Sequence, residues 1–376
     1  MLRKLWDHLV KIVNYPVLPV IWCKSVVIVS LSIVLGAAAL VWIVDPHYRY
    51  RLPEFYDTVY YEVYATAPRL LRDLDYNTLY LGSSMTRNIF LSDIDEVLKV
   101  RSIKLAASGA ATADLAKFVD IAIKAKGKKL QQIIFSLDIY SMNKPEPHYK
   151  EFEYLYRDDL KEEYRYLFSR QTYSSMYYLL KRKYRPKKKR QHQTDPNRMF
   201  STEYAGMRFG WQEVVSDAVG NEKAHHTQTP AAPEVFENTL NNILLPMVKN
   251  NPQIKFVFYL APYHIYTYCQ SEQFHEADAL LKQRLRVMKE LLLCSNVRLY
   301  DYQADRSLVC CHDLYSDVQH FRSTAGRMIV EKLAANHRRI SSAEAADAND
   351  RELRKLIAEQ MPVYYSDLEK FKNKKR

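Results

Sequence analysis

The stretch that decides the fold is Thr78–Asn88, which reads TLYLGSSMTRN. A short apolar run leads directly into small residues, so it predicts a strand over Thr78–Leu81 that turns at once into a helix over Met85–Val100. Such a turn exposes the Ser84 hydroxyl and leaves the helix N-terminus facing any negative charge that develops there. A serine in this place can equally be an ordinary helix N-cap.

The alternation of strand and helix continues along the chain on both sides of the irregular stretch 139–232. Four further strands are predicted, at Ser102–Ala106, Gln132–Leu137, Lys255–Leu260 and Val297–Tyr300. Helices are predicted between and after them, at Thr112–Lys126, Glu234–Asn250, Glu276–Leu293 and Phe321–Arg338. This order predicts an α/β fold, a three-layer sandwich around a mainly parallel five-stranded sheet.

Ligands of open α/β sheets bind at the carboxyl ends of the strands, so the residues just after each strand are candidates for a site. Gly109 comes after the second strand, where its N–H could donate to an oxyanion or where glycine simply suits a turn. Asp138 comes after the third strand and could orient a substrate, hold the site loops or cap the next segment.

Asp317 and His320 stand immediately before the last predicted helix, in the sequence SDVQHF. An Asp three residues before a His can fold back so that its carboxylate reaches Nδ1. That contact fixes the tautomer and stabilises the imidazolium formed when Nε2 takes a serine proton. Alone, such a pair also serves as a solvated or capping pair.

An uncharged run of 20 residues, Ser25–Val44, precedes the α/β pattern. Twenty helical residues span roughly 30 Å, the thickness of a bilayer core, so 25–44 is predicted to be a transmembrane helix. Residues 1–24 then form a cytoplasmic segment and 45–77 a membrane-proximal connector. A cleaved signal peptide, with small residues at 37–39, and a buried soluble helix are the alternatives.

Basic residues flank this run unequally. Four precede it and two come closely after it: Arg3, Lys4, Lys11 and Lys24, then Arg49 and Arg51. The excess favours a cytoplasmic N-terminus, which would place the C-terminal domain in the periplasm or outside the cell.

These turns, in this order, resemble the SGNH/GDSL hydrolase superfamily, whose first block is typically Gly-Asp-Ser and whose last is Asp-x-x-His. The anchor, the Asp45-Pro46 after it, LGSSMTRN and the LAASGA turn resemble a membrane-anchored branch more narrowly. That branch includes DltD-like and alginate-acetylation-type proteins of polysaccharide loci. The resemblance covers roughly 45–338, without 139–232.

The resemblance implies roles for individual residues. Ser84 matches the nucleophile, His320 the general base and Asp317 the acid that orients it, and the N–H groups of Ser84 and Gly109 match the oxyanion donors. Ser83 stands where the superfamily has Asp, and Asp138 lies near the position of its Asn.

Two functions from different classes fit this resemblance. The first is an esterase or acyl- or acetyltransferase acting on a cell-surface polysaccharide, beside a membrane-bound O-acyltransferase. The second is a non-catalytic assembly or glycan-binding partner that keeps the fold without the chemistry.

Five cysteines occur in the chain: Cys23, Cys269, Cys294, Cys310 and Cys311. Cys23 lies at the membrane edge. In an oxidising compartment Cys269 and Cys294 are plausible partners for Cys310 or Cys311, and free buried thiols are the alternative. No spacing is typical of a metal site, so neither a metal nor a cofactor is expected.

The formal net charge is +12, and the stretch 181–190 holds eight basic residues in ten. Such a run would suggest nucleic acid in a cytosolic protein, but the anchor argues against that partner. A solvated loop, or contact with anionic glycans or lipid headgroups, fits better. We therefore expect an SGNH-like domain over 78–340 with a basic, Tyr-rich insertion at 139–232, and then a charged tail at 341–376.

Overall fold

The computed structural model describes residues 18–54, 56–157, 159–185, 193–203, 206–224 and 233–374. The chain forms two compact units. Unit 1 comprises Met1–Pro53 and Tyr154–Arg185, and unit 2 comprises Glu54–Glu153 and Pro186–Arg376. The expected insertion at 139–232 is therefore shared between the two units.

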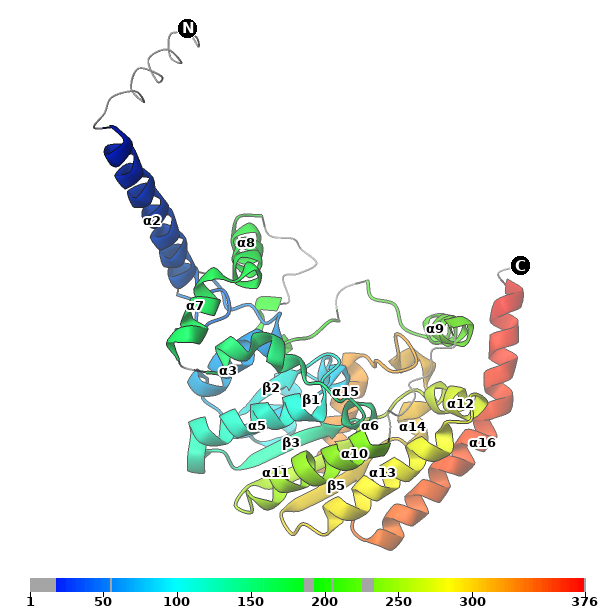
Figure 1. Ribbon diagram of the computed structural model, residues 1–376. Helices are drawn as coiled ribbons and strands as arrows, with labels where there is room; N and C mark the ends of the chain where they lie inside the picture. The colour runs from blue at the N-terminus through cyan, green and yellow to red at the C-terminus, as the bar shows by residue number, and fades with distance from the viewer. Residues whose placement is uncertain are drawn as a thin grey trace. The chain divides into compact units, whose positions relative to one another are not determined.

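A mostly parallel sheet forms the centre of unit 2 (Figure 1). Its strands are β1 Thr78–Gly82, β2 Ser102–Ala106, β3 Gln132–Leu137, β4 Lys255–Leu260, β5 Val297–Asp301 and β6 Arg339–Ile340. They lie in the order β2-β1-β3-β4-β5-β6, and only β6 is antiparallel, to β5. The expected α/β fold is thus confirmed. The expected count of five strands was wrong, because the two-residue β6 is too short to leave a sequence pattern.

The strands form because their residues are apolar, aromatic or β-branched and can be buried on both faces, as parallel sheets require. All five residues of β1 are buried, as are the last five of β3 and of β4. Because β1 lies between β2 and β3, its carboxyl end is surrounded by the ends of both neighbours.

Helices connect and cover the strands of unit 2. The α-helices are α3 Val63–Asp73, α4 Leu91–Leu98, α5 Thr112–Lys126, α6 Ile139–Met142, α9 Trp211–Ala224, α10 Pro233–Thr239, α11 Leu245–Lys249, α12 Tyr266–Gln273, α13 Ala277–Leu292, α14 Arg306–Val309, α15 Ser323–Ala334 and α16 Ala343–Lys374. Other helical segments are η1 Ser84–Thr86, η2 Gly127–Lys129, η3 His148–Leu155, η5 Pro196–Arg198, η6 Leu240–Leu244 and η7 His312–Leu314. Figure 1 shows α5, α11 and α13 along one side of the strands.

The helix predicted over 85–100 begins later than expected. After the 3₁₀ turn η1 the chain stays irregular until Leu91, where α4 starts. The reason is tertiary: the buried Lys104 of β2 donates through Nζ to the carbonyl oxygens of Arg87 (2.8 Å) and Ile89 (2.6 Å). Those carbonyls are therefore withdrawn from helical hydrogen bonding.

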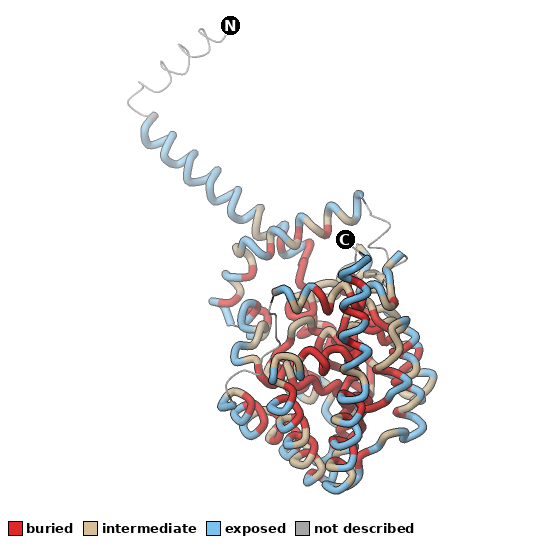
Figure 2. The backbone as a smooth tube through the Cα atoms, turned by 90° about the vertical axis from the view of Figure 1, so that its right-hand side faces the viewer, coloured by how far each residue is buried: buried red, intermediate tan, exposed pale blue. Residues whose placement is uncertain are grey.

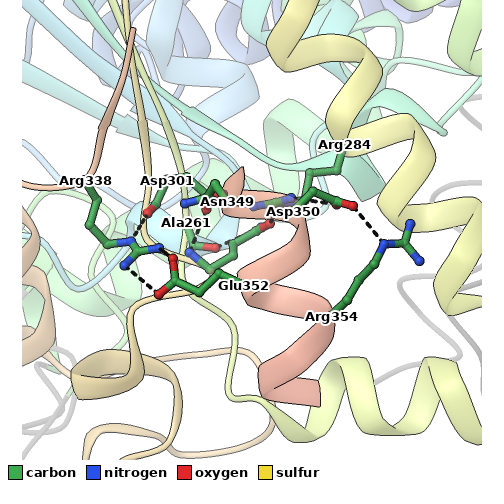
Figure 3. A network of polar contacts seen from close by, with 9 residues as sticks. Ala261, Arg284, Asp301, Arg338, Asn349, Asp350, Glu352 and Arg354 are labelled. Carbon is green, nitrogen blue, oxygen red and sulfur yellow. Dashed lines mark hydrogen bonds and ion pairs between the residues drawn. The ribbon is translucent and has the colours of Figure 1, made fainter. Parts of the chain in front are cut away.

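The charged segment 341–376 contains the long helix α16, which packs against α13, α12 and α9. A buried polar network joins it to the sheet (Figure 3). Arg284 of α13 donates to Asp301 at the end of β5, to Asn349 (2.6 Å) and Asp350 (3.2 Å) of α16, and to Gln303 (3.0 Å). This segment is thus an integral part of unit 2.

Unit 1 contains α2 Leu18–Val44, α7 Leu160–Phe168 and α8 Arg170–Tyr184. From Pro19 to Val44, α2 is long and apolar enough to span a membrane. Figure 2 shows it exposed along most of its length, whereas a core helix of a soluble protein would be covered by protein. Residues 1–17, which carry three of the four basic residues before the span, lie outside the described part of the chain, as do residues 186–190 of the basic run.

The chain leaves α2 through a tight polar turn within unit 1. The Asp45 carboxylate accepts the N–H groups of Arg49 (2.8 Å), Tyr50 (2.8 Å) and Arg51 (3.0 Å), and the hydroxyl of Tyr166 in α7 (2.6 Å). Asp45 therefore fixes the end of α2 against α7.

Candidate functional site

The turn after β1 presents Ser84 at the carboxyl end of that strand. Gly82 permits the turn, because a Cβ at this position would lie 2.6 Å from side-chain atoms of both Ser136 and Thr86. Ser83 is buried, whereas Ser84 is half-buried. The predicted strand and turn are present, and Ser84 is less buried than Ser83 within that turn.

The segment before α15 brings His320 to this serine. His320 Nε2 lies 2.8 Å from Ser84 Oγ, and His320 Nδ1 lies 2.9 Å from Asp317 Oδ2. The structure therefore places the three residues in the relative positions expected from the sequence, although 236 residues separate Ser84 from His320. With the Nδ1 proton directed at Asp317, Nε2 is free to accept the serine proton.

Asp317 is held by its own turn. Its Oδ1 accepts the backbone N–H groups of Gln319 and His320, each at 2.7 Å. Burial alone would raise the pKa of Asp317, but hydrogen bonds and charge attraction from His320 outweigh it, so the pKa lies below its usual value. The carboxylate is therefore ionised at neutral pH, as a group that orients an imidazole must be.

One backbone group and two side chains from elsewhere in unit 2 fix the segment between Asp317 and His320. The Val318 carbonyl accepts the His264 N–H (3.0 Å) and the Thr267 hydroxyl (2.6 Å), and the Val318 N–H donates to Asp217 (3.2 Å). None of these three was expected from the sequence, because each acts through a backbone group and no local motif marks it.

Asn88 links the two halves of the site. Its side-chain amide donates to the Phe321 carbonyl (2.9 Å), and its Oδ1 accepts from Ser201 (3.1 Å) and from the N–H of Glu203 (3.2 Å). Asn88 stands four residues after Ser84, and Phe321 is the residue after His320. This buried side chain thus connects the serine turn to the histidine segment.

Asp138 lies beneath the serine turn rather than against the Ser84 hydroxyl. Its carboxylate accepts the hydroxyls of Ser83 (2.9 Å) and Tyr263 (2.5 Å) and the Tyr140 N–H (3.0 Å). In all three contacts the Asp138 carboxylate is the acceptor, so Asp138 holds the loops here. Of the roles expected for Asp138, the contacts favour the structural one.

Gly109 lies in the turn that follows β2, the strand next to β1. β1 and β2 are in register at Gly82 and Ala106, and the Ala107 N–H donates to the Gly82 carbonyl (2.9 Å). Gly109 has a φ of +64°, and its carbonyl accepts Lys144 Nζ at 2.6 Å.

The N–H groups of Gly109 and Ser84 have no hydrogen-bond partner among the described residues. Two unpaired donors at neighbouring strand ends suit the stabilisation of an oxyanion.

Taken together, the site holds the hydroxyl of a half-buried serine, an oriented imidazole, an ionised carboxylate and N–H donors without a partner among the described residues. This set can carry out nucleophilic acyl transfer. In the described part of the chain, no group of three or more His, Cys, Asp and Glu side chains is placed to hold a metal ion. The four cysteines of unit 2 are free thiols, and Cys269 is fully buried.

Comparison with known proteins does not identify a family for this chain. No family model matches the chain, and no curated protein matches it in sequence.

Proposed function

We propose that the protein is a membrane-anchored serine esterase or acyltransferase of SGNH-like type that acts on a cell-surface polysaccharide. The observation that carries the proposal is the Ser84–His320–Asp317 arrangement, with contacts of 2.8 and 2.9 Å. These contacts join two segments that are far apart in the sequence of the α/β unit. They meet at the carboxyl end of β1, and open α/β sheets bind ligands at the carboxyl ends of their strands.

In the proposed reaction, His320 Nε2 takes the Ser84 proton while Ser84 Oγ attacks an ester carbonyl. The N–H groups of Ser84 and Gly109 stabilise the resulting oxyanion. The ester bond then breaks, and His320 returns the proton to the departing alkoxide. The acyl group remains bound to Ser84. Water, or a sugar hydroxyl, then attacks this acyl group with His320 again as base, which regenerates the serine.

The polysaccharide substrate and a membrane-bound O-acyltransferase partner belong to the same proposal. They are supported by the resemblance of the LGSSMTRN and LAASGA turns and by the apolar helix α2. The strand order reverses after β2, and right-handed crossovers then put α4 and α5 on opposite faces of the sheet. This supports the three-layer arrangement of the superfamily.

A fluorophosphonate probe tests the proposal directly, since it labels only an activated serine. The intact chain in detergent should be labelled, and Ser84→Ala and His320→Asn should both abolish labelling, because members of such a unit fail together. Asp317→Ala should retain more reactivity, since its role is orientation. Ser92→Ala, at an exposed serine of α4, is the matched control.

Absence of labelling in a chain that folds normally would overturn the enzymatic proposal. The non-catalytic, glycan-binding function would then take its place.

A further inference from the structure

A cavity of about 230 Å³ lies beside the carboxyl end of β2. The start of α3, the turn after Ser84, the β2 end and the segment 193–202 form its walls. It is smaller than the roughly 300–1,000 Å³ of sites for drug-sized ligands, so it suits one small ring.

Arg87 supplies the positive charge of this cavity. Within the described part of the chain, its guanidinium has neither an ion pair nor a hydrogen-bond partner, although the residue is only half-exposed. Its backbone, in contrast, is fixed at both ends: the N–H donates to the Ser84 carbonyl (3.2 Å) and the carbonyl accepts Lys104 Nζ (2.8 Å). An unpaired guanidinium that extends from a fixed backbone into a concave site is suited to a carboxylate or phosphate group.

The other walls are aromatic and polar. Tyr60, Tyr61, Tyr64 and Phe200 line the cavity, and the Tyr60 and Phe200 rings meet edge to face at 6.1 Å. Aromatic faces offer apolar contact at a low cost in entropy, and tyrosine hydroxyls add polar contacts at the rim.

Glu62 also lines the cavity, and no described donor reaches its carboxylate. Burial, with the nearby charge of Glu151, raises its pKa. An acid that faces the same space as Arg87 disfavours a ligand that is anionic throughout. It favours one that has hydroxyl groups to donate as well as a single anionic group.

We propose that this cavity binds one sugar residue that carries an anionic group, with Arg87 at the anion and Glu62 at ring hydroxyls. Since Arg87 lies three residues after Ser84, a sugar held here places its neighbouring ester beside the nucleophile. The inference rests on the proposed function for its link to catalysis, but sugar binding itself needs no chemistry at Ser84.

Binding to the full chain in detergent tests the proposal by saturation-transfer NMR and calorimetry. The probes are methyl glucuronide, glucose 6-phosphate, the neutral methyl glucoside and inorganic phosphate. At least one anionic sugar should bind about 10-fold or more tightly than the glucoside, since a charge-assisted hydrogen bond is lost with the anion. Comparing the two anionic sugars distinguishes a carboxylate from a phosphate.

Arg87→Gln should reduce binding of the preferred anionic sugar to the level of the glucoside, whereas Arg298→Gln, at an exposed arginine of β5, should change nothing. Glu62→Gln should weaken charged and neutral sugars alike. Equal binding of charged and neutral sugars, binding of inorganic phosphate as tight as that of the sugars, no binding at all, or unchanged binding in Arg87→Gln would each overturn the proposal.

Fluorophosphonate labelling of Arg87→Gln separates the two proposals. The probe is uncharged and small, so labelling should persist when sugar binding is lost. If the wild-type chain binds the sugar but is not labelled by the fluorophosphonate, only the proposed acyl-transfer chemistry is contradicted.

Discussion

At the scale of single residues, the sequence was most informative where a chemical group acts through its own side chain. Ser84, Asp317 and His320 could be proposed because a small-residue turn and an Asp three residues before a His leave local patterns. Asn88, Asp138 and the other residues that hold the site leave none. Their partners are distant in sequence, and nothing local distinguishes a buried Asn from an exposed one.

Asn88 gives the sharpest test of this supporting role. Asn88→Ala should lower the rate of ester hydrolysis about 100-fold with little change in KM, because it loosens the serine turn from the histidine segment without touching substrate. A chromogenic acyl ester provides the measurement. Asn242→Ala, at an exposed asparagine of η6, is the control. A loss confined to KM would assign Asn88 to substrate binding instead.

At the scale of elements, the strands were predicted better than the helices that connect them. β2, β3 and β4 have the predicted bounds because buried parallel strands are unbroken apolar runs. The start of α4 was misplaced, since only the fold brings Lys104 to the carbonyls of Arg87 and Ile89. The helix predicted at 234–250 is present as α10, η6 and α11, and Pro246, which lacks an N–H, lies just after the wide turn η6.

The fully buried Arg284 links α16 to the end of β5 through its contacts with Asn349, Asp350 and Asp301. Arg284→Met should destabilise the protein by about 3–5 kcal/mol, because Asp301 would remain buried without its cation and Asp350 would keep only Arg354. Thermal unfolding of the detergent-solubilised chain measures this. Arg286→Met, on the same helix but in a partly exposed pair with Glu290, should cost no more than about 1 kcal/mol. Similar losses in both variants would show that the network contributes no more than a surface pair.

At the scale of the whole molecule, the basic residues on either side of α2 predict the direction in which the chain would cross a membrane. A reporter that is active only outside the cytoplasm, fused after Arg376, should be active, because four basic residues precede the apolar run and two come closely after it. Substituting Arg3, Lys4 and Lys11 by Gln should reduce that activity. Strong activity of a cytoplasm-only reporter at the same position would reverse the assigned orientation.

Stability against acid is the second property of the whole molecule that can be derived, and it depends on a histidine behind the site. His264 is fully buried, and burial, with the nearby His312, lowers its pKa well below 6.5. Its Nδ1 accepts the Tyr266 N–H (3.2 Å), and its ring lies 4.6 Å from that of His312 and 5.3 Å from that of Tyr315. The neighbouring His312 faces Asp367, at 3.9 Å, and its pKa is also lowered by burial.

The sign of the effect depends on which state binds the proton. Because the pKa of His264 is lower in the folded chain, the unfolded chain takes up a proton first, so stability is full above about pH 6.5 and falls as the pH drops below it. His264→Asn keeps an acceptor for the Tyr266 N–H but cannot titrate. Between pH 6.5 and 5, the wild type should therefore lose up to about 1.4 kcal/mol per pH unit more than this variant. Unfolding measured at several pH values checks this, with the exposed His275→Asn as control. Parallel pH profiles for wild type and His264→Asn would mean that His264 is protonated equally in both states, and that the acid sensitivity of the fold comes from other groups.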